Sequence, residues 1–197
     1  MLLDLVDKTR TIRRFDTSKS ITGGDLMYIL ECARRVASAG NLQRLRYMII
    51  DGEEARAAFS EISLGGLLPP EKKPTRDVAP VSYVVISSYD ASPDANLLID
   101  VGISAEAVVL SARERGIGAC MIRNFKSEYF MGSDGSMPLY PILVIALGYP
   151  LEDARIVDVG EDGELKYYKC ENGVNIVPKR TLSSLIVQKT TKCKLLL

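Results

Sequence analysis

The chain has 197 residues, of which 47% are hydrophobic, and its 25 basic and 25 acidic side chains cancel in charge. This length and composition predict one soluble folded domain, and the balanced charge leaves no overall field to attract nucleic acid or an anionic membrane surface. The sequence contains no histidine, which excludes Ser/His/Asp hydrolysis, Cys/His proteolysis and the commonest metal ligand. We therefore expect any chemistry to belong to a bound cofactor.

The N-terminus and the cysteines predict a cytoplasmic protein. Asp4 and Asp7 stand where a signal peptide needs a basic start. The cysteines are widely spaced and form no Cys-x-x-Cys pair, at Cys32, Cys120, Cys170 and Cys193. Because no apolar run approaches the roughly 20 residues needed to cross a bilayer, we also expect no membrane span.

The first half of the chain predicts helices, strands and one long loop. Apolar residues at helical spacing over residues 22–37 predict an amphipathic helix with Thr22 as its N-cap. We expect a strand over residues 46–51 and a short helix over residues 53–60. Residues 64–76 contain many Gly and Pro breakers and predict a mobile loop that could cover a site.

Buried elements dominate the middle of the chain. The β-branched run over residues 81–88 predicts a central strand covered on both faces, and residues 142–147 predict another apolar strand. Between them, Ser92-Pro93-Asp94 opens a long helix that ends at Gly116, a residue suited to a left-handed helix end. This helix is apolar around most of its circumference, so we expect it to be buried nearly all round and to lie near a dimer interface.

The last third predicts short strands, over residues 155–159, 165–170 and 174–177. Turns at Glu161-Asp162-Gly163 and Asn172-Gly173 are typical of hairpins. Residues 182–197 predict a helix or an extended arm. No repeat or linker divides the chain, so we expect one α+β domain over residues 1–197, with a small β-hairpin extension around residues 155–178.

Three short segments could bind anions or a flat ligand. Arg10, Arg13 and Arg14 with Thr11 offer guanidinium and hydroxyl ligands for a phosphate, although a solvated basic face is the alternative. The small residues of the Ser38-Ala39-Gly40-Asn41 turn permit close approach of a ligand, and Asn41 and Gln43 offer amide groups to heterocycle edges; a helix stop is the alternative. Pro178-Lys179-Arg180 repeats the anion-binding chemistry, or is a surface pair.

Gly116-Ile117-Gly118 does not predict a dinucleotide-binding fingerprint. These glycines follow a helix and precede an apolar stretch, whereas a Rossmann fingerprint follows a strand and opens a helix.

Taken in order, the segments resemble the FMN-dependent nitroreductase family. Its opening Arg-Arg-Ser-x-Arg-x-Phe signature is matched by Arg10, Thr11, Arg13 and Phe15, with Thr9 in place of the leading Arg. Its Pro-Ser-x-x-Asn-x-Gln-Pro-Trp turn is matched by Ser38, Asn41 and Gln43, with other residues at Ala37, Arg44 and Leu45. Further similarity covers residues 100–105, 116–118, 121–125, 146–150 and 177–180.

The resemblance implies a three-layer α/β/α fold with a mostly antiparallel central sheet and a long buried dimer helix. It implies FMN as cofactor, NADH or NADPH as electron donor, and a homodimer with FMN sites at its interface. The cycle it implies is ping-pong: hydride passes from the nicotinamide to FMN, and then to a small acceptor such as a nitroaromatic or a quinone. FMN would then be contacted by Arg10, Thr11, Arg13, Ser38, Ala39, Asn41, Gln43, Met121, Ile122, Arg123, Lys179 and Arg180.

Two other functions fit the same residues. One is a flavin-binding carrier or sensor without turnover, which the departures at Thr9, Arg44 and Arg123 would accommodate. The other is a cofactor-free α+β protein in which every cluster is surface. For Cys120, near the predicted flavin segment, a buried inert thiol and a redox role are the alternatives.

Overall fold

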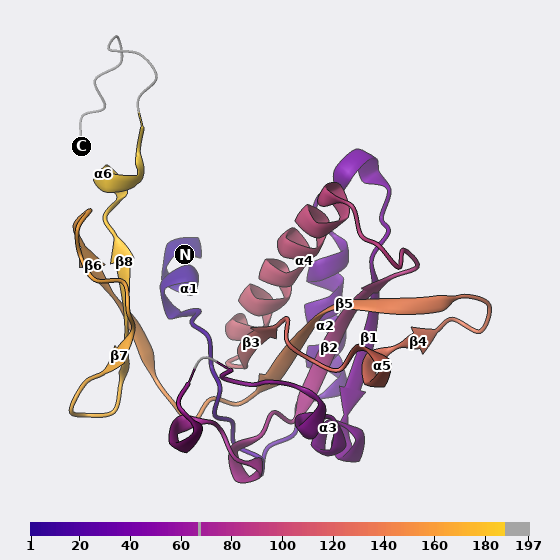
Figure 1. The fold of residues 1–197 in the computed structure, drawn as a ribbon, viewed down its shortest axis with the longest axis horizontal. Coiled ribbons are helices and arrows are strands. Elements are labelled where there is room, and N and C mark those ends of the chain that lie inside the picture. The colour runs from indigo at the N-terminus through magenta and orange to yellow at the C-terminus, as the bar shows by residue number, and fades with distance from the viewer. Residues whose placement is uncertain (67, 188–197) are drawn as a thin grey trace. The chain divides into compact units, whose positions relative to one another are not determined.

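The computed structural model describes residues 1–66 and 68–187, whose contacts divide into two compact units (Figure 1). The first unit runs from Met1 to Glu152, and the second begins at Asp153. The expectation of a single domain over the whole chain stays a prediction.

An antiparallel sheet forms the centre of the first unit. Its strands follow the order β1 (Arg46–Asp51), β2 (Ser82–Ser88), β5 (Pro138–Gly148) and β3 (Gly118–Ile122). The short strand β4 (Gly132–Ser133) pairs with the first two residues of β5. Every residue of β2 is buried, which confirms the predicted central strand covered on both faces. Because successive side chains of a strand point to opposite faces, β2 and β5 contribute to two separate apolar cores.

One face of the sheet is covered by α2 (Gly23–Arg34) and α4 (Ala95–Glu114), which pack against each other (Figure 1). The opposite face is covered by α3 (Gly52–Ala58), the short α5 (Ser127–Phe130) and the N-terminal segment around Phe15. The predicted α+β fold, with helices flanking a mostly antiparallel sheet, is therefore confirmed.

The long helix α4 ends before the predicted glycine but begins later than predicted: Ser92 and Pro93 were expected as its N-cap and first-turn residue, whereas Asp94 is the N-cap and the helix starts at Ala95. Asp94 accepts a hydrogen bond from the backbone N–H of Leu97 at 2.7 Å, and Gly116 has a φ of 73°, the left-handed conformation that glycine adopts most readily. The face of α4 toward the sheet is buried, whereas Leu98, Ile99 and Ile103 are 40%, 59% and 39% exposed in the single chain.

Among the described residues, α4 alone is long and apolar enough to cross a membrane by length and composition. Asp100 and Glu106 interrupt its apolar residues, and the expectation of no membrane span stays a prediction. A core helix of a soluble protein passes the same test, and the buried side of α4 packs in the core of the first unit.

Two further elements open the chain and its first loop. The helix α1 (Leu2–Lys8) ends just before the cationic segment, and Thr22 caps α2 as predicted, accepting a hydrogen bond from Asp25 N–H. A 3-10 turn, η2 (Phe59–Glu61), follows α3 and precedes the predicted loop. In its described part, the loop itself has two more 3-10 turns, η3 (Pro70–Lys72) in its middle and η4 (Arg76–Val78) at its end. Leu67 lies outside the described residues.

A small sheet forms the second unit. Its strand order is β6 (Ala154–Val159), β8 (Asn175–Arg180) and β7 (Tyr168–Lys169). The predicted hairpin at Asn172-Gly173 is confirmed, since β7 and β8 are antiparallel and Cys170 N–H donates to Val174 O.

The predicted hairpin at Glu161-Asp162-Gly163 is wrong. The strand before this turn, β6, pairs with β8 in parallel, so β8 occupies the centre of the sheet and separates β6 from β7. In the C-terminal tail, α6 covers Leu182–Leu185, and residues 188–197 lie outside the described residues.

Candidate functional site

The cationic segment lies against the start of β3. Ile12 N–H donates to Ala119 O at 2.9 Å, and Thr11 and Ala119 form a parallel β-bridge. Ile12 and Phe15 are buried in the apolar core on the α3 and α5 face of the sheet, called the second core below, which leaves Thr11 exposed and Arg13 partly exposed. Two buried apolar residues thus hold the segment while its polar residues reach the surface.

Two glycines permit this close packing. A Cβ at Gly118 would lie 2.9 Å from Ile12, and a Cβ at Gly148 would lie 2.8 Å from the ring of Phe15. Carbon atoms in favourable contact are about 3.5–4.0 Å apart, so any side chain at these positions would displace the cationic segment. The Gly116-Ile117-Gly118 sequence therefore serves a helix end and close packing.

The arginines of the segment already have partners within the first unit. Arg10 donates from Nη2 to Val6 O at 2.6 Å, and its buried Nε has no hydrogen-bond partner among the described residues. Arg13 is held through its backbone, which donates to Glu152 Oε1 at 2.6 Å. Thr9, at the position of the family's leading Arg, is buried, and its hydroxyl donates to Leu5 O at 2.6 Å.

The small-residue turn has an unusual backbone. A 3-10 turn, η1 (Ala39–Asn41), carries positive φ at Gly40 (56°) and Asn41 (54°), and Gln43 follows with 49°. Such conformations are uncommon for residues other than glycine and are concentrated at functional sites. The amide side chains of Asn41 and Gln43 are exposed, so the turn presents hydrogen-bonding groups to solvent.

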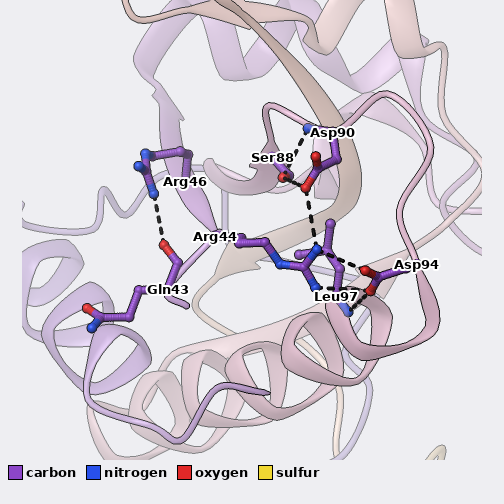
Figure 2. A network of polar contacts seen from close by, with 7 residues as sticks. All are labelled: Gln43, Arg44, Arg46, Ser88, Asp90, Asp94 and Leu97. Atoms are coloured by element: carbon purple, nitrogen blue, oxygen red, sulfur yellow. Dashed lines mark hydrogen bonds and ion pairs between the residues drawn. The ribbon is translucent and has the colours of Figure 1, made fainter. Parts of the chain in front are cut away.

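The first turns of α4 fix both ends of this segment. At one end, Ala39 N–H donates to Asp100 Oδ1 at 2.8 Å. At the other end, the guanidinium of Arg44 binds both oxygens of Asp94 at 3.0 Å and lies 3.7 Å from Asp90, as Figure 2 shows. The hydrogen bond from Arg44 holds the pKa of Asp94 at about 2, and its partner Asp94 raises the pKa of Arg44.

A cavity of about 160 Å³ lies beside the turn. Tyr47 and Ser104 share a hydrogen bond of 2.8 Å at its wall, and burial raises the pKa of Tyr47. Ligand sites usually measure roughly 300–1,000 Å³, so this cavity is too small to hold a whole cofactor. It is lined by Ala33, Arg34, Val36, Ala37, Ser38, Gln43, Leu45, Arg46, Tyr47, Asp100 and Ser104.

Comparisons with known proteins decide the family. The model of the nitroreductase family matches residues 6–149, almost three quarters of the chain. The chain belongs to the nitroreductase family. The resemblance stated from the sequence is thereby confirmed, as is the expected class, a nitroreductase-family oxidoreductase.

Individual relatives of this nitroreductase-family chain are distant in sequence. YodC of Bacillus subtilis, which carries the assignment NAD(P)H nitroreductase, is 20% identical over 184 residues, covering 78% of this chain and 91% of YodC.

Solved structures confirm the fold. A protein from Desulfovibrio desulfuricans, assigned as a nitroreductase and solved in complex with FMN, has a TM-score of 0.65 at 16% identity, covering 96% of both chains. The FMN-dependent nitroreductase NfnB of Mycobacterium smegmatis, solved with NADPH, has a TM-score of 0.61 at 15% identity, covering 76% of this chain and 87% of NfnB.

The segment predicted to pass a flavin ring begins on β3. Met121 and Arg123 are exposed, whereas Ile122 is 4% exposed and packs in the second core, so only its backbone is available to a ligand. Burial raises the pKa of Cys120 to about 11, which keeps this thiol neutral at physiological pH.

The late cationic pair belongs to β8 of the second unit. Lys179 is exposed, and Arg180 donates to the backbone oxygen of Glu161. Neighbouring residues of a strand point to opposite faces, so Lys179 and Arg180 face different sides of this sheet. Sequence reasoning grouped them, and it missed Asp94 and Asp100 as partners of the turn.

The turn and the cationic segment lie at opposite ends of α4. Asp100 binds the turn near the start of the helix, whereas Ile12 binds the strand that follows its end at Gly116. A helix rises 1.5 Å per residue, so Asp100 and the last helical residue, Glu114, are separated by about 21 Å along the axis. One chain of this nitroreductase-family protein therefore keeps its two best candidate ligand-binding segments far apart.

Proposed function

We propose that this protein is an FMN-dependent oxidoreductase that works as a homodimer and draws electrons from NADH or NADPH to reduce a small organic acceptor, such as a nitroaromatic or a quinone. The observation that carries this proposal is the placement of two candidate flavin-binding segments at opposite ends of α4. If both contact one FMN, the segments must come from two chains.

The residues of the cationic segment fit a phosphate. Thr11 offers an exposed hydroxyl, and the guanidinium groups of Arg10 and Arg13 suit bidentate phosphate contacts. The buried Nε of Arg10, which lacks a partner in the described part of the chain, marks a side chain whose hydrogen bonding is incomplete. In the second unit, Lys179 is exposed, whereas Arg180 already binds Glu161.

The turn fits the edge of a flat heterocycle. Ser38 and Ala39 are small, and the exposed amides of Asn41 and Gln43 can donate and accept hydrogen bonds. On β3, Met121 and Arg123 offer side chains, and Ile122 offers its backbone, to the other part of the ligand.

The exposed side of α4 supports a second copy as the partner. Leu98, Ile99 and Ile103 form an apolar face that the single chain leaves open, and apolar faces of this kind are typical of interfaces. This face lies on the helix that joins the two candidate segments. Docking two chains through α4 would therefore cover the face and bring segments of different chains within reach of each other.

Bound FMN would supply the redox chemistry by accepting a hydride from the nicotinamide and passing it on to the acceptor. The chain's own residues need only bind and orient the ring. This division of labour suits a sequence without histidine, in which the buried Cys120 is held as a neutral thiol. We also propose a cytoplasmic location, on the basis of the free cysteines and the nicotinamide donor.

An absorbance spectrum after incubation with FMN and desalting tests the proposal. We expect the protein to retain yellow colour and to bleach when NADH or NADPH is added without oxygen. Retained colour that neither nucleotide bleaches would contradict the enzymatic proposal and support a flavin-binding carrier or sensor. A protein that retains no colour would contradict both.

A further inference from the structure

Two carboxylates at the start of α4 bind the turn that begins at Ser38. Asp100 accepts from Ala39 N–H at 2.8 Å, and Asp94 binds both terminal nitrogens of Arg44 at 3.0 Å (Figure 2). Asp94 and Asp100 are six residues apart, within the first two turns of the helix. One rigid element thus holds both ends of the segment that runs from Ala39 to Arg44.

Within the turn, the backbone hydrogen bonds are those of its 3-10 turn, from Asn41 N–H to Ser38 O at 3.0 Å and from Leu42 N–H to Ala39 O at 3.1 Å. The side-chain hydrogen bonds are longer: Gln43 N–H donates to Ser38 Oγ at 3.3 Å, and the side chain of Gln43 donates to Asn41 of the same turn at 3.2 and 3.4 Å. The family pattern has prolines where this chain has Ala37 and Arg44. Proline restricts the backbone of the unfolded and flexible states, so this chain lacks that source of rigidity.

Arg44 is built into the fold more firmly than an ordinary surface arginine. Its side chain is 24% exposed and its charge interacts with Asp94, Asp90 and Asp100 together, while its buried Nε has no hydrogen-bond partner among the described residues. Asp100 is 2% exposed, and its Oδ2 has no hydrogen-bond partner within the described ranges. Its other oxygen, Oδ1, accepts the hydrogen bond from Ala39 N–H, so this buried side chain is fixed against the turn.

Asp94 links the turn to the helix itself. The same Oδ1 atom that Arg44 binds also accepts the capping hydrogen bond from Leu97 N–H at 2.7 Å. The position of Arg44 is therefore tied to the first turn of α4 and moves with it. Arg46 also donates to Gln43 O at 3.1 Å, so a second arginine binds the end of the turn (Figure 2).

We propose that Arg44 is a positioning residue for the cofactor: its ion pair with Asp94, acting with Asp100, holds the turn in the conformation that binds the flavin. This inference rests on the proposed function for its ligand, but the rigidity of the turn can be measured without any ligand.

The first test measures backbone hydrogen exchange in the FMN-free protein. We expect Arg44→Gln to speed exchange of the amides from Ala39 to Gln43, and the matched control Arg35→Gln, which breaks an exposed ion pair with Glu31, to leave them unchanged. Asp94→Asn keeps a good N-cap but removes the charge, so it should speed exchange as Arg44→Gln does. Exchange in the turn that is equal in wild type and Arg44→Gln would overturn the proposal.

The second test measures FMN affinity by fluorescence quenching with the oxidised cofactor alone. Exposed ion pairs change free energies by amounts that correspond to about two- to fivefold in affinity, so we expect losses of that size for Arg44→Gln and for Asp94→Asn. The double variant should be no weaker than either single variant, because both remove the same ion pair. Additive losses would overturn the role of the pair.

The two tests separate this inference from the proposed function. Faster exchange in Arg44→Gln, in a protein whose wild type does not bind FMN, would support the hold on the turn and contradict the proposed function. Unchanged exchange in Arg44→Gln, in a protein whose wild type binds FMN, would contradict the hold on the turn and leave the proposed function supported.

Discussion

Replacing Gly148 by Ala tests how the cationic segment is held. The new Cβ would lie 2.8 Å from Cδ1, 2.9 Å from Cβ and 3.0 Å from Cγ of Phe15, which is fully buried. Phe15 cannot retreat easily, since its backbone N–H donates to Val78 O at 3.0 Å and the residue bridges to Pro150.

The size of the effect follows from two opposing terms. Overpacking a core costs about 1–3 kcal/mol, and replacing Gly by Ala returns about 0.4–1 kcal/mol through the unfolded state. We expect a net loss of roughly 1–2 kcal/mol in the free energy of unfolding, which lowers Tm by about 2–8 °C in a unit of this size. Phe15→Leu in the same chain should recover part of the loss, because the smaller side chain leaves room for the new methyl group.

Urea unfolding and thermal melting of Gly148→Ala measure the loss, with Gly23→Ala as the control. A Cβ at Gly23 meets nothing within 4 Å, so this control should stay within about 0.5 kcal/mol of wild type. If Gly148→Ala were as stable as Gly23→Ala, the proposed packing of Phe15 on β5 would be refuted.

Three further predictions concern buried or paired groups. In the folded protein, the pKa values of Asp94 and Glu31 are both about 2, below the usual value. Their contribution to stability should therefore be complete above about pH 4–5 and be lost as the pH falls toward 2, which urea unfolding across this pH range measures. Cys120, buried with its pKa raised to about 11, should resist iodoacetamide at pH 8 in the native protein and react in denaturant, as peptide mass spectrometry would show. Tyr47→Phe leaves the buried hydroxyl of Ser104 without this partner and should cost about 0.5–1.5 kcal/mol of unfolding free energy, measured in urea.

Local patterns in the sequence predicted most of the first unit. The strand over residues 46–51 was predicted with its observed bounds, and the long helix was recognised from its Ser92-Pro93-Asp94 opening and its glycine end at Gly116, although its N-cap is Asp94. These signals are strong because the cap, the periodicity and the burial pattern all indicate the same structure.

Pairing between distant segments was not predictable in the same way. Strand β3 follows the glycine pair and was not predicted as a strand, and β6 pairs with β8 rather than with the strand nearest in sequence. Register and partner choice depend on long-range packing, which a local turn does not specify.

The candidate site shows the same limit. The cationic segment and the turn were recognised from residue types and spacing. The sequence did not predict that they lie at opposite ends of α4, or that Asp94 and Asp100 bind the turn; both became visible only in the structure. One signal was present in the sequence, since Asp100 is a carboxylate within the apolar face of a helix. Such a residue usually has a specific partner.

A mixed dimer tests most directly whether two chains share each flavin site. One chain would carry Arg10→Gln and Arg13→Gln, and the other Asn41→Ala and Gln43→Ala, with a different affinity tag on each chain for purification. A heterodimer retains one site in which the intact cationic segment of one chain meets the intact turn of the other. We predict that it binds one FMN with wild-type affinity while both parent homodimers bind poorly; a heterodimer that binds as poorly as its parents would contradict a site shared between chains.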